Sequence, residues 1–205
     1  MMGLSSNCPV SSFFFSRNKR MFLDSCVLNQ ACEDQDVAKL LEVTGEKYST
    51  FIASISLLEV GFGPRDKADI KQQQEVMELY QHTKTVNSSS IDSIDVLNSN
   101  KAGKKYLYIP EEHEWFGARH NLIKWMEQEN VGGSSARKQQ NDALIFMCAW
   151  NANSFLITDN VKDFLRFNVI LHNEHGGHLP IFSLEDLKRS QTEEVVFPCN
   201  VKNYL

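Results

Sequence analysis

The sequence predicts an α/β protein, a three-layer α/β/α sandwich with a mainly parallel central sheet. Short apolar runs that are typical of buried strands alternate with segments of helical periodicity from residue 21 to residue 187. Strands joined by helices favour parallel pairing with right-handed crossovers. The chain has 205 residues, which suits one domain with a sizeable core better than two.

Five short segments have the composition of buried strands, because they are rich in apolar, β-branched or aromatic residues. They are MFLD at 21–24, FIASI at 51–55, YLYIP at 106–110, FLIT at 155–158 and the start of LPIFSLEDL at 179–187. The last of these strands leads into a short helix, for which Ser183 is the expected N-cap.

Helices are predicted between these strands. The segments are 34–43, 56–63, 68–83, 111–129 and 139–150. The first places its apolar residues on one face and ends at Gly45. The last, QQNDALIFMCAW, is apolar on nearly every side, which predicts a helix in the centre of the protein.

The domain organisation follows from composition. Residues 1–20 contain no acid, and their apolar part precedes their basic part, the reverse of a secretory signal peptide. We expect a disordered or dispensable extension at 1–20, a folded domain at 21–190 with an insertion near 85–105, and a tail at 191–205. No run approaches the roughly 18 apolar residues of a spanning helix, so no membrane partner is expected.

Cysteine usage and net charge indicate the cellular compartment and the kind of partner. Five cysteines without a CxxC spacing predict a reducing compartment and a cytoplasmic protein. The net charge of −5 provides no overall field that would attract a polyanion, so a nucleic-acid partner would need a local basic patch.

Acidic side chains follow two predicted strands directly. Asp24 ends MFLD, and Asp159 follows FLIT in the stretch NSFLITDNVKDF. The carboxyl ends of parallel strands meet at one edge of a sheet, where ligands bind. Glu59, one turn after FIASI, and Asp142, in the first turn of the apolar helix, fit the same place. Neighbouring carboxylates repel one another, and a divalent cation such as Mg²⁺ or Mn²⁺ resolves that conflict.

Each acid alone has an ordinary explanation, because Asp is common at helix N-termini and Glu is usually solvated. Other chemistries lack their residues. GxSxG, the P-loop and GxGxxG do not occur, and a haloacid-dehalogenase phosphatase would need a second Asp where Cys26 stands. The histidines of HNEHGGH (His172, His175 and His178) would suit a transition metal on a helix, but Gly176 and Gly177 favour a solvated turn.

Four segments resemble, in order and context, the motifs of the PIN-domain nucleases, most closely the VapC-type toxin ribonucleases. They are MFLDSCVL, ISLLEV, QNDALIFMCA and FLITDNVKDF, within a similarity that covers about 21–188. The resemblance implies that Asp24 ends the first strand, Glu59 follows the second, Asp142 opens a late helix, and a Thr-led acidic loop occupies 158–163.

That resemblance implies a Mg²⁺-dependent endoribonuclease, with Mn²⁺ as an alternative ion and a metal-activated water as the nucleophile. The implied metal ligands are Asp24, Glu59, Asp142 and one or more of Asp159, Asn160 and Asp163, with Asp159 among the catalytic acids. Thr158, Arg137 and Lys138 are the expected contacts to the RNA substrate.

The resemblance further implies the toxin of a toxin–antitoxin pair, with a small antitoxin as partner and a homodimer as assembly. The long segment at 66–135 and the N-terminal extension depart from small toxins, which weakens the toxin assignment more than the nuclease one. The alternative is a non-catalytic PIN-like module that binds RNA or protein. The complete set of four acids favours the enzyme.

Overall fold

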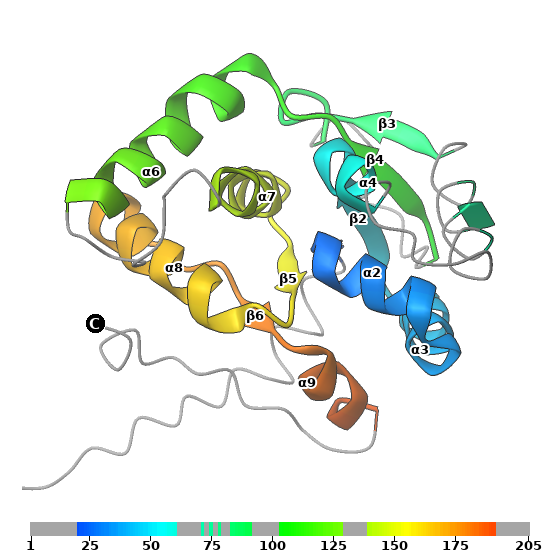
Figure 1. Ribbon diagram of the computed structural model, residues 1–205. Helices are drawn as coiled ribbons and strands as arrows, with labels where there is room; N and C mark the ends of the chain where they lie inside the picture. Colours follow the sequence, from blue (N-terminus) through cyan, green and yellow to red (C-terminus); the bar gives the residue numbers. More distant parts are fainter. Residues whose placement is uncertain are drawn as a thin grey trace, which may run out of the picture.

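The computed structural model describes residues 20–60, 71, 74–75, 78, 83–91, 103–128 and 139–191, without the side chains of 117–119, 125–126 and 173–175. Its centre is a six-stranded sheet with the order β3-β4-β2-β1-β5-β6, in which every pairing is parallel (Figure 1). The strands are β1 (Arg20–Leu23), β2 (Ser49–Ala53), β3 (Lys84–Val86), β4 (Lys105–Tyr108), β5 (Phe155–Ile157) and β6 (Ile181–Phe182).

Helices cover both faces of the sheet. They are α2 (Ser25–Glu33), α3 (Gln35–Gly45), α4 (Ser54–Val60), a π-helical turn η1 (Glu114–Ala118), α6 (Arg119–Gln128), α7 (Gln140–Asn151), α8 (Val161–His175) and α9 (Leu184–Arg189). One apolar core lies under α6, α7 and α8, and the other lies under α2, α3 and α9. Side chains alternate between these cores along each strand, so Phe22 enters the first and Met21 and Leu23 enter the second. The predicted three-layer α/β/α class is confirmed.

Helix α7 is the central helix, as the sequence predicted. All seven residues from Ala143 to Ala149 are buried. A helix that is apolar all round must be enclosed by other elements. The sheet lies on one side of α7, and α6 and α8 lie beside it (Figure 1).

Two helices, α2 and α8, and one strand, β3, were not predicted. Helix α2 buries Val27, Leu28, Ala31 and Cys32, a helical spacing that directly follows the first strand. Strand β3 occupies part of the segment expected to be an insertion. The expected helix at 68–83 lies mostly outside the described residues, and residues 71, 74, 75 and 78 of it are helical.

Helix α8 corrects the prediction of a loop followed by a solvated turn. Its residues Phe164, Leu165 and Phe167 are buried under the sheet, and burial of this apolar stripe stabilises the helix. The helix extends through His175 and ends at Gly176, whose φ of +68° is the left-handed conformation that glycine adopts readily. The rings of His172 and His178 stack with a centroid distance of 4.6 Å.

The predicted cap of the last helix is confirmed. Ser183 Oγ accepts a hydrogen bond from the Asp186 backbone N–H at 3.0 Å, and the Asp186 carboxylate accepts one from the Ser183 N–H at 2.9 Å. This reciprocal pair is a capping box.

Arg20, the first residue of β1, is buried. Its Nη1 donates a hydrogen bond to the backbone oxygen of Ala152 at 2.8 Å, and its Nη2 donates to that of Ile91 at 3.5 Å. A buried guanidinium is costly unless such acceptors surround it. The side chain therefore ties the start of β1 to the end of α7. Residues 1–19 lie outside the described residues, and their dispensability stays a prediction.

We expect a protein that begins at Arg20 behind an initiator methionine to be as stable as the full chain. The full chain carrying Arg20→Met should lose about 1–3 kcal/mol of unfolding free energy, because two backbone oxygens lose their buried donor. Urea denaturation of the three proteins measures both effects. Equal stability of wild type and Arg20→Met would contradict the second expectation.

Candidate active site at the carboxyl edge of the sheet

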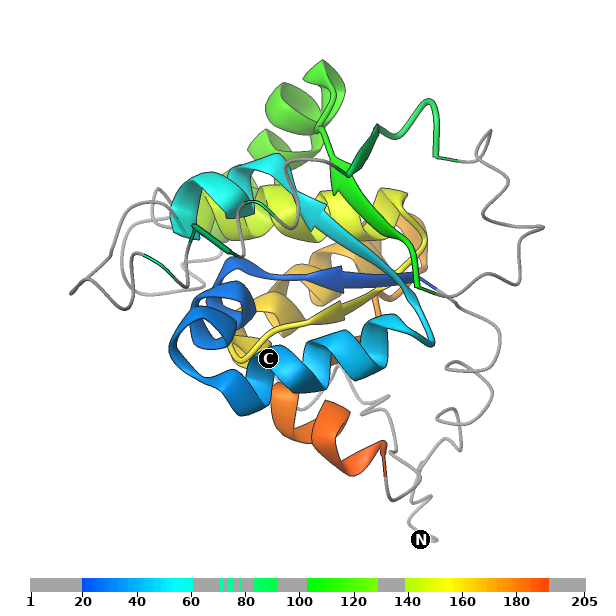
Figure 2. The same cartoon turned by 90° about the vertical axis from the view of Figure 1, so that its right-hand side faces the viewer.

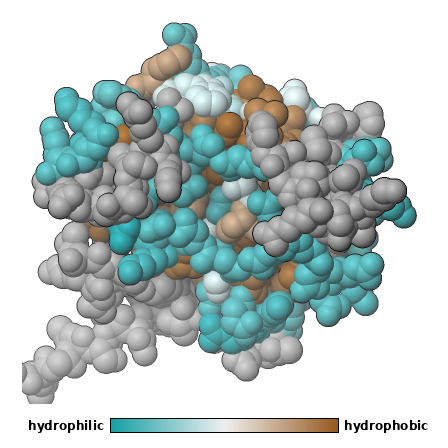
Figure 3. Space-filling model, in the orientation of Figure 1, coloured by the Kyte–Doolittle hydropathy of each residue, from teal (hydrophilic) through white to brown (hydrophobic). Residues whose placement is uncertain are grey.

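The candidate site lies where strand order reverses. From β1 the chain first builds outward through β2 on one side, and it later adds β5 and β6 on the other. Ligands of open parallel sheets bind at such a switch point, beyond the carboxyl ends of the strands. The strand arrows in Figure 2 point to the same side, at the left. Figure 3 shows a largely hydrophilic surface across the middle of the face seen in Figure 1, with hydrophobic residues grouped in its upper part.

Asp24 is the centre of this site. It follows β1, is 2% exposed and caps α2 through a 2.7 Å bond from the Ser25 N–H to its Oδ1. Its Oδ2 accepts hydrogen bonds from Thr158 Oγ1 at 2.7 Å and from Cys26 Sγ at 3.0 Å. Burial raises the pKa of Asp24 above its ordinary value, against these hydrogen bonds, and the charge of Glu59 raises it further. The charged form of Asp24 is thus held at a cost.

Two side chains hold Asp24 in place. Thr158, which was expected to contact substrate, is fully buried. Its hydroxyl donates a hydrogen bond to Asp24 and accepts one from the Asn160 N–H at 3.0 Å. Cys26 was not predicted to belong to the site. Burial and the charge of Asp24 raise the pKa of Cys26 to about 12, so its thiol stays protonated and remains a donor at neutral pH.

Glu59 reaches the same region from α4. Its Oε1 accepts a 2.6 Å hydrogen bond from Nδ2 of Asn141 on α7. Its Oε2 is buried and has no hydrogen-bond partner among the described residues. A buried carboxylate oxygen without a donor is costly, so this atom indicates a missing positive partner.

Asp142 lies in the first turn of α7, and its Oδ2 accepts a 3.3 Å hydrogen bond from Asn160 Nδ2. Burial, followed by the charges of Asp24, Glu59 and Asp163, raises the pKa of Asp142 to about 7. These acids come from four places in the fold, after β1, in α4, in α7 and in α8, and the other three raise the pKa of Asp142. We call Asp24, Glu59, Asp142 and Asp163 the acidic cluster.

The acids after β5 have different surroundings. Asp159 turns toward other partners, since its Oδ2 accepts from Gln30 Nε2 at 2.6 Å and its Oδ1 from the Leu184 N–H at 3.1 Å. Asp163, in the first turn of α8, uses Oδ1 for Arg166 Nη1 at 2.8 Å, and its Oδ2 accepts no hydrogen bond among the described residues. Asp163 therefore suits a metal ligand better than Asp159.

The structure gives less information on the other expected site residues. The side-chain amide nitrogen of Asn160 donates a hydrogen bond to Asp142, so the side-chain oxygen of Asn160 is the atom that could coordinate an ion. Arg137 and Lys138 lie outside the described residues. Asn141 was missed, although a polar residue directly before Asp142 in an apolar helix was a usable signal.

Within the described ranges, no three His, Cys, Asp or Glu side chains form a ready metal-binding group. The donor set nevertheless fits a hard divalent cation. It offers carboxylate oxygens, among them Oε2 of Glu59, which has no hydrogen-bond partner among the described residues. The pKa values of Asp24 and Asp142 are raised first by burial and further by neighbouring acids.

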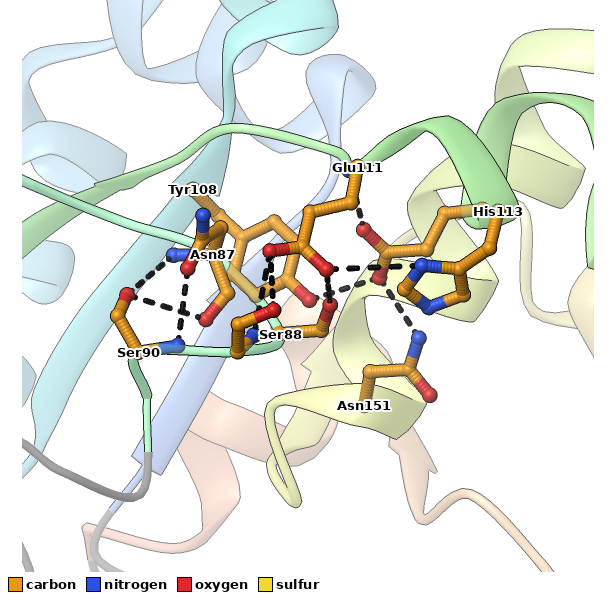
Figure 4. A network of polar contacts seen from close by, with 9 residues as sticks. Asn87, Ser88, Ser90, Tyr108, Glu111, His113 and Asn151 are labelled. Carbon is orange, nitrogen blue, oxygen red and sulfur yellow. Dashed lines mark hydrogen bonds and ion pairs between the residues drawn. The ribbon is translucent and has the colours of Figure 1, made fainter.

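A second polar cluster lies beyond β4 (Figure 4). Glu114 in η1 is fully buried, and its carboxylate accepts 2.7 Å hydrogen bonds from the Tyr108 hydroxyl, Asn151 Nδ2 and the Glu111 N–H. Glu111 in turn accepts from the hydroxyls of Ser88 and Ser89. Through these hydrogen bonds Glu114 joins β4 to α7. The segment predicted as one helix at 111–129 contains the π-helical turn η1.

Comparison with solved structures finds chains of similar fold. No family model matches the chain, and no curated protein matches it. The chain is similar to one in the crystal structure of VapBC2 from Rickettsia felis bound to a DNA fragment from their promoter. The two are 18% identical, the alignment covers 80% of this chain and 98% of that chain, and the TM-score is 0.48. The fold class rests on the strand order and layers described above, a three-layer α/β/α sandwich around a parallel six-stranded sheet.

No helix in the described part of the chain combines the length and apolar character that crossing a membrane requires.

The raised pKa of Asp142 predicts that the metal-free protein becomes more stable as the pH falls. Between the unfolded value of 3.8 and the folded value of about 7, the native state binds a proton that the unfolded state lacks. Stability should therefore rise as the pH drops from 8 to about 4.5, by roughly 3 kcal/mol. Asp142→Asn should be more stable than wild type at pH 8 and should show a shallower pH dependence.

Urea unfolding in the presence of a chelator, at pH 4.5, 6 and 8, measures this dependence. Identical pH slopes for wild type and Asp142→Asn would show that Asp142 is not the responsible group.

Proposed function

We propose that the protein is a Mg²⁺-dependent endoribonuclease that hydrolyses RNA phosphodiester bonds at the acidic cluster, with Mn²⁺ as an alternative ion. The observation that carries the proposal is the set of acids at the switch point whose charges act on Asp142, together with a buried oxygen of Glu59 that has no hydrogen-bond partner among the described residues. Such a cluster destabilises a metal-free protein, so folding alone does not explain it. RNA as the substrate follows from the resemblance of the sequence motifs to PIN-domain nucleases.

A bound divalent ion would neutralise charge on the phosphate and lower the pKa of an attacking water. The protein supplies the positions of its ligands. Thr158 and Cys26 fix Asp24, Asn141 fixes Glu59, and Asn160 fixes Asp142. On Glu59 and Asp142 the donor engages one carboxylate oxygen, and the other oxygen accepts no hydrogen bond among the described residues. Asp24 accepts hydrogen bonds on both oxygens, so an ion would have to replace one of these bonds.

The main alternative is a PIN-like module that binds RNA or protein without catalysis. A binding module gains nothing from four acids placed against a polyanion, since they oppose the phosphate backbone. The toxin role, an antitoxin partner, a homodimer and a cytoplasmic location extend the proposal and rest on the sequence resemblance. An adjacent gene for a small DNA-binding protein would support the toxin role over a housekeeping nuclease.

Asp24→Asn should abolish metal-dependent RNA cleavage and leave the fold intact. Asn is a good N-cap, so α2 should keep its cap while the site loses a charged ligand. Asp34→Asn is the matched control, because Asp34 caps α3 in the same way and lies outside the acidic cluster. Cleavage of a labelled single-stranded RNA, with circular dichroism as the fold check, tests the proposal. Undiminished cleavage by Asp24→Asn would contradict it.

Mn²⁺ should stabilise the wild-type protein by about 1–3 kcal/mol at saturating millimolar concentration, because it binds the folded state alone. Asp163→Asn and Asp142→Asn should lose most of this stabilisation. Asp159→Asn should keep it, although the variant loses the contacts to Gln30 and Leu184 and starts from a lower melting temperature. Melting curves with and without Mn²⁺ separate the two acids. Loss of the Mn²⁺ shift in Asp159→Asn but not in Asp163→Asn would reverse the ligand assignment.

A further inference from the structure

We propose that the guanidinium of Arg166 binds a backbone phosphate of the RNA beside the acidic cluster. This inference rests on the nuclease function proposed above and names the residue that offsets the charge of its site. Arg166 was not singled out by the sequence patterns, because a lone arginine on a helix is usually a solvated surface residue.

The position of Arg166 is fixed by a member of the acidic cluster. Nη1 of Arg166 lies 2.8 Å from Oδ1 of Asp163, one turn earlier on α8. The side chains are 23% and 29% exposed, so the pair lies partly sheltered at the rim of the site. Asp163 acts electrostatically on Asp142, which connects the guanidinium to the centre of the cluster.

A nuclease with this cluster needs a cation besides its metal. Four carboxylates repel the phosphates that flank the cleaved bond, and those phosphates lie beyond the ion itself. Helix α8 begins at the carboxyl edge, so its first two turns lie beside the path of a nucleic acid that enters the site. Arg166 is the arginine there, with Lys162 exposed on the same part of the helix.

The chemistry of the side chain suits a phosphate. Guanidinium carries five N–H donors in a planar fork that matches phosphate oxygens. Among the described residues, Asp163 is the acceptor that Arg166 uses, through one nitrogen. Donors therefore remain for a ligand, and the Asp163 contact lowers the entropy lost when the arginine binds it.

A plain helix-stabilising ion pair is the competing explanation, and the chain contains a matched example. Arg189 Nη2 lies 2.6 Å from Asp186 Oδ1 in α9, with the same spacing of three residues and exposed fractions of 53% and 25%. Asp186 is not one of the charges that act on Asp142. Arg189→Met therefore removes a similar ion pair outside the acidic cluster.

The experiment uses the full chain and a short single-stranded RNA. In the cleavage-deficient Asp24→Asn protein, we expect the additional change Arg166→Met to weaken RNA binding at least about tenfold, and to reduce the salt dependence by about 0.7 in slope. In the active protein, Arg166→Met should raise KM with little change in kcat, and Arg166→Lys should restore part of the affinity. The thermal shift caused by Mn²⁺ should remain in Arg166→Met. Arg189→Met should resemble wild type in each assay.

The outcomes separate the two proposals. If wild type cleaves RNA and Arg166→Met binds RNA as Arg189→Met does, with the same salt slope, Arg166 is a structural residue and the inference is overturned while the nuclease function stands. If wild type neither cleaves RNA nor shows the Mn²⁺ shift, the nuclease function fails and the inference fails with it. If Arg166→Met is poorly folded, Arg166→Lys decides, because it keeps the charge without the planar fork.

Discussion

The burial of negative charge at the end of β1 is the constraint on which the rest of the structure depends. Asp24 is nearly inaccessible to water, yet it must cap α2 and lies within electrostatic reach of Glu59 and Asp142. A row of uncharged donors makes this arrangement tolerable. Thr158 and Cys26 bond to Asp24, Asn160 joins Thr158 to Asp142, and Asn141 bonds to Glu59. These bonds connect β1, α4, α7 and the segment after β5, so the same contacts that hold the layers together also define the site.

The fold class was predictable because its signal is local. Alternating apolar runs and helical segments indicate buried strands and covering helices. Helix α7 is apolar on every side, which indicates a position in the centre of the protein. Helix α2 was missed because Asp24 was interpreted as a metal ligand alone, whereas an Asp after a strand also caps a helix. Helix α8 was missed because its polar last turn, HNEHGGH, resembles a loop in sequence.

The sequence indicated acids whose charges act on one another in the fold, but it did not indicate how each side chain is oriented. Asp159 and Asp163 both follow β5 within six residues, so sequence position alone does not distinguish them as candidate metal ligands. Their difference comes from partners far along the chain, since Gln30 engages Asp159 across 129 positions. Glu114 was beyond prediction for a similar reason. In EEHEW it resembles a solvated acid, and its burial depends on Tyr108 and Asn151 from other elements.

The strand order also has a consequence for synthesis of the protein. Strand β1 is synthesised well before its neighbour β5, which lies more than 130 positions later in the chain, and Thr158, the donor to Asp24, comes after β5. Until then one edge of the central strand stays unpaired, and Asp24 and Glu59 lack their donors from α7 and β5. The four acids of the cluster can therefore come together only after α7, β5 and α8 have been synthesised. A nascent chain that ends before β5 therefore holds no assembled acidic cluster.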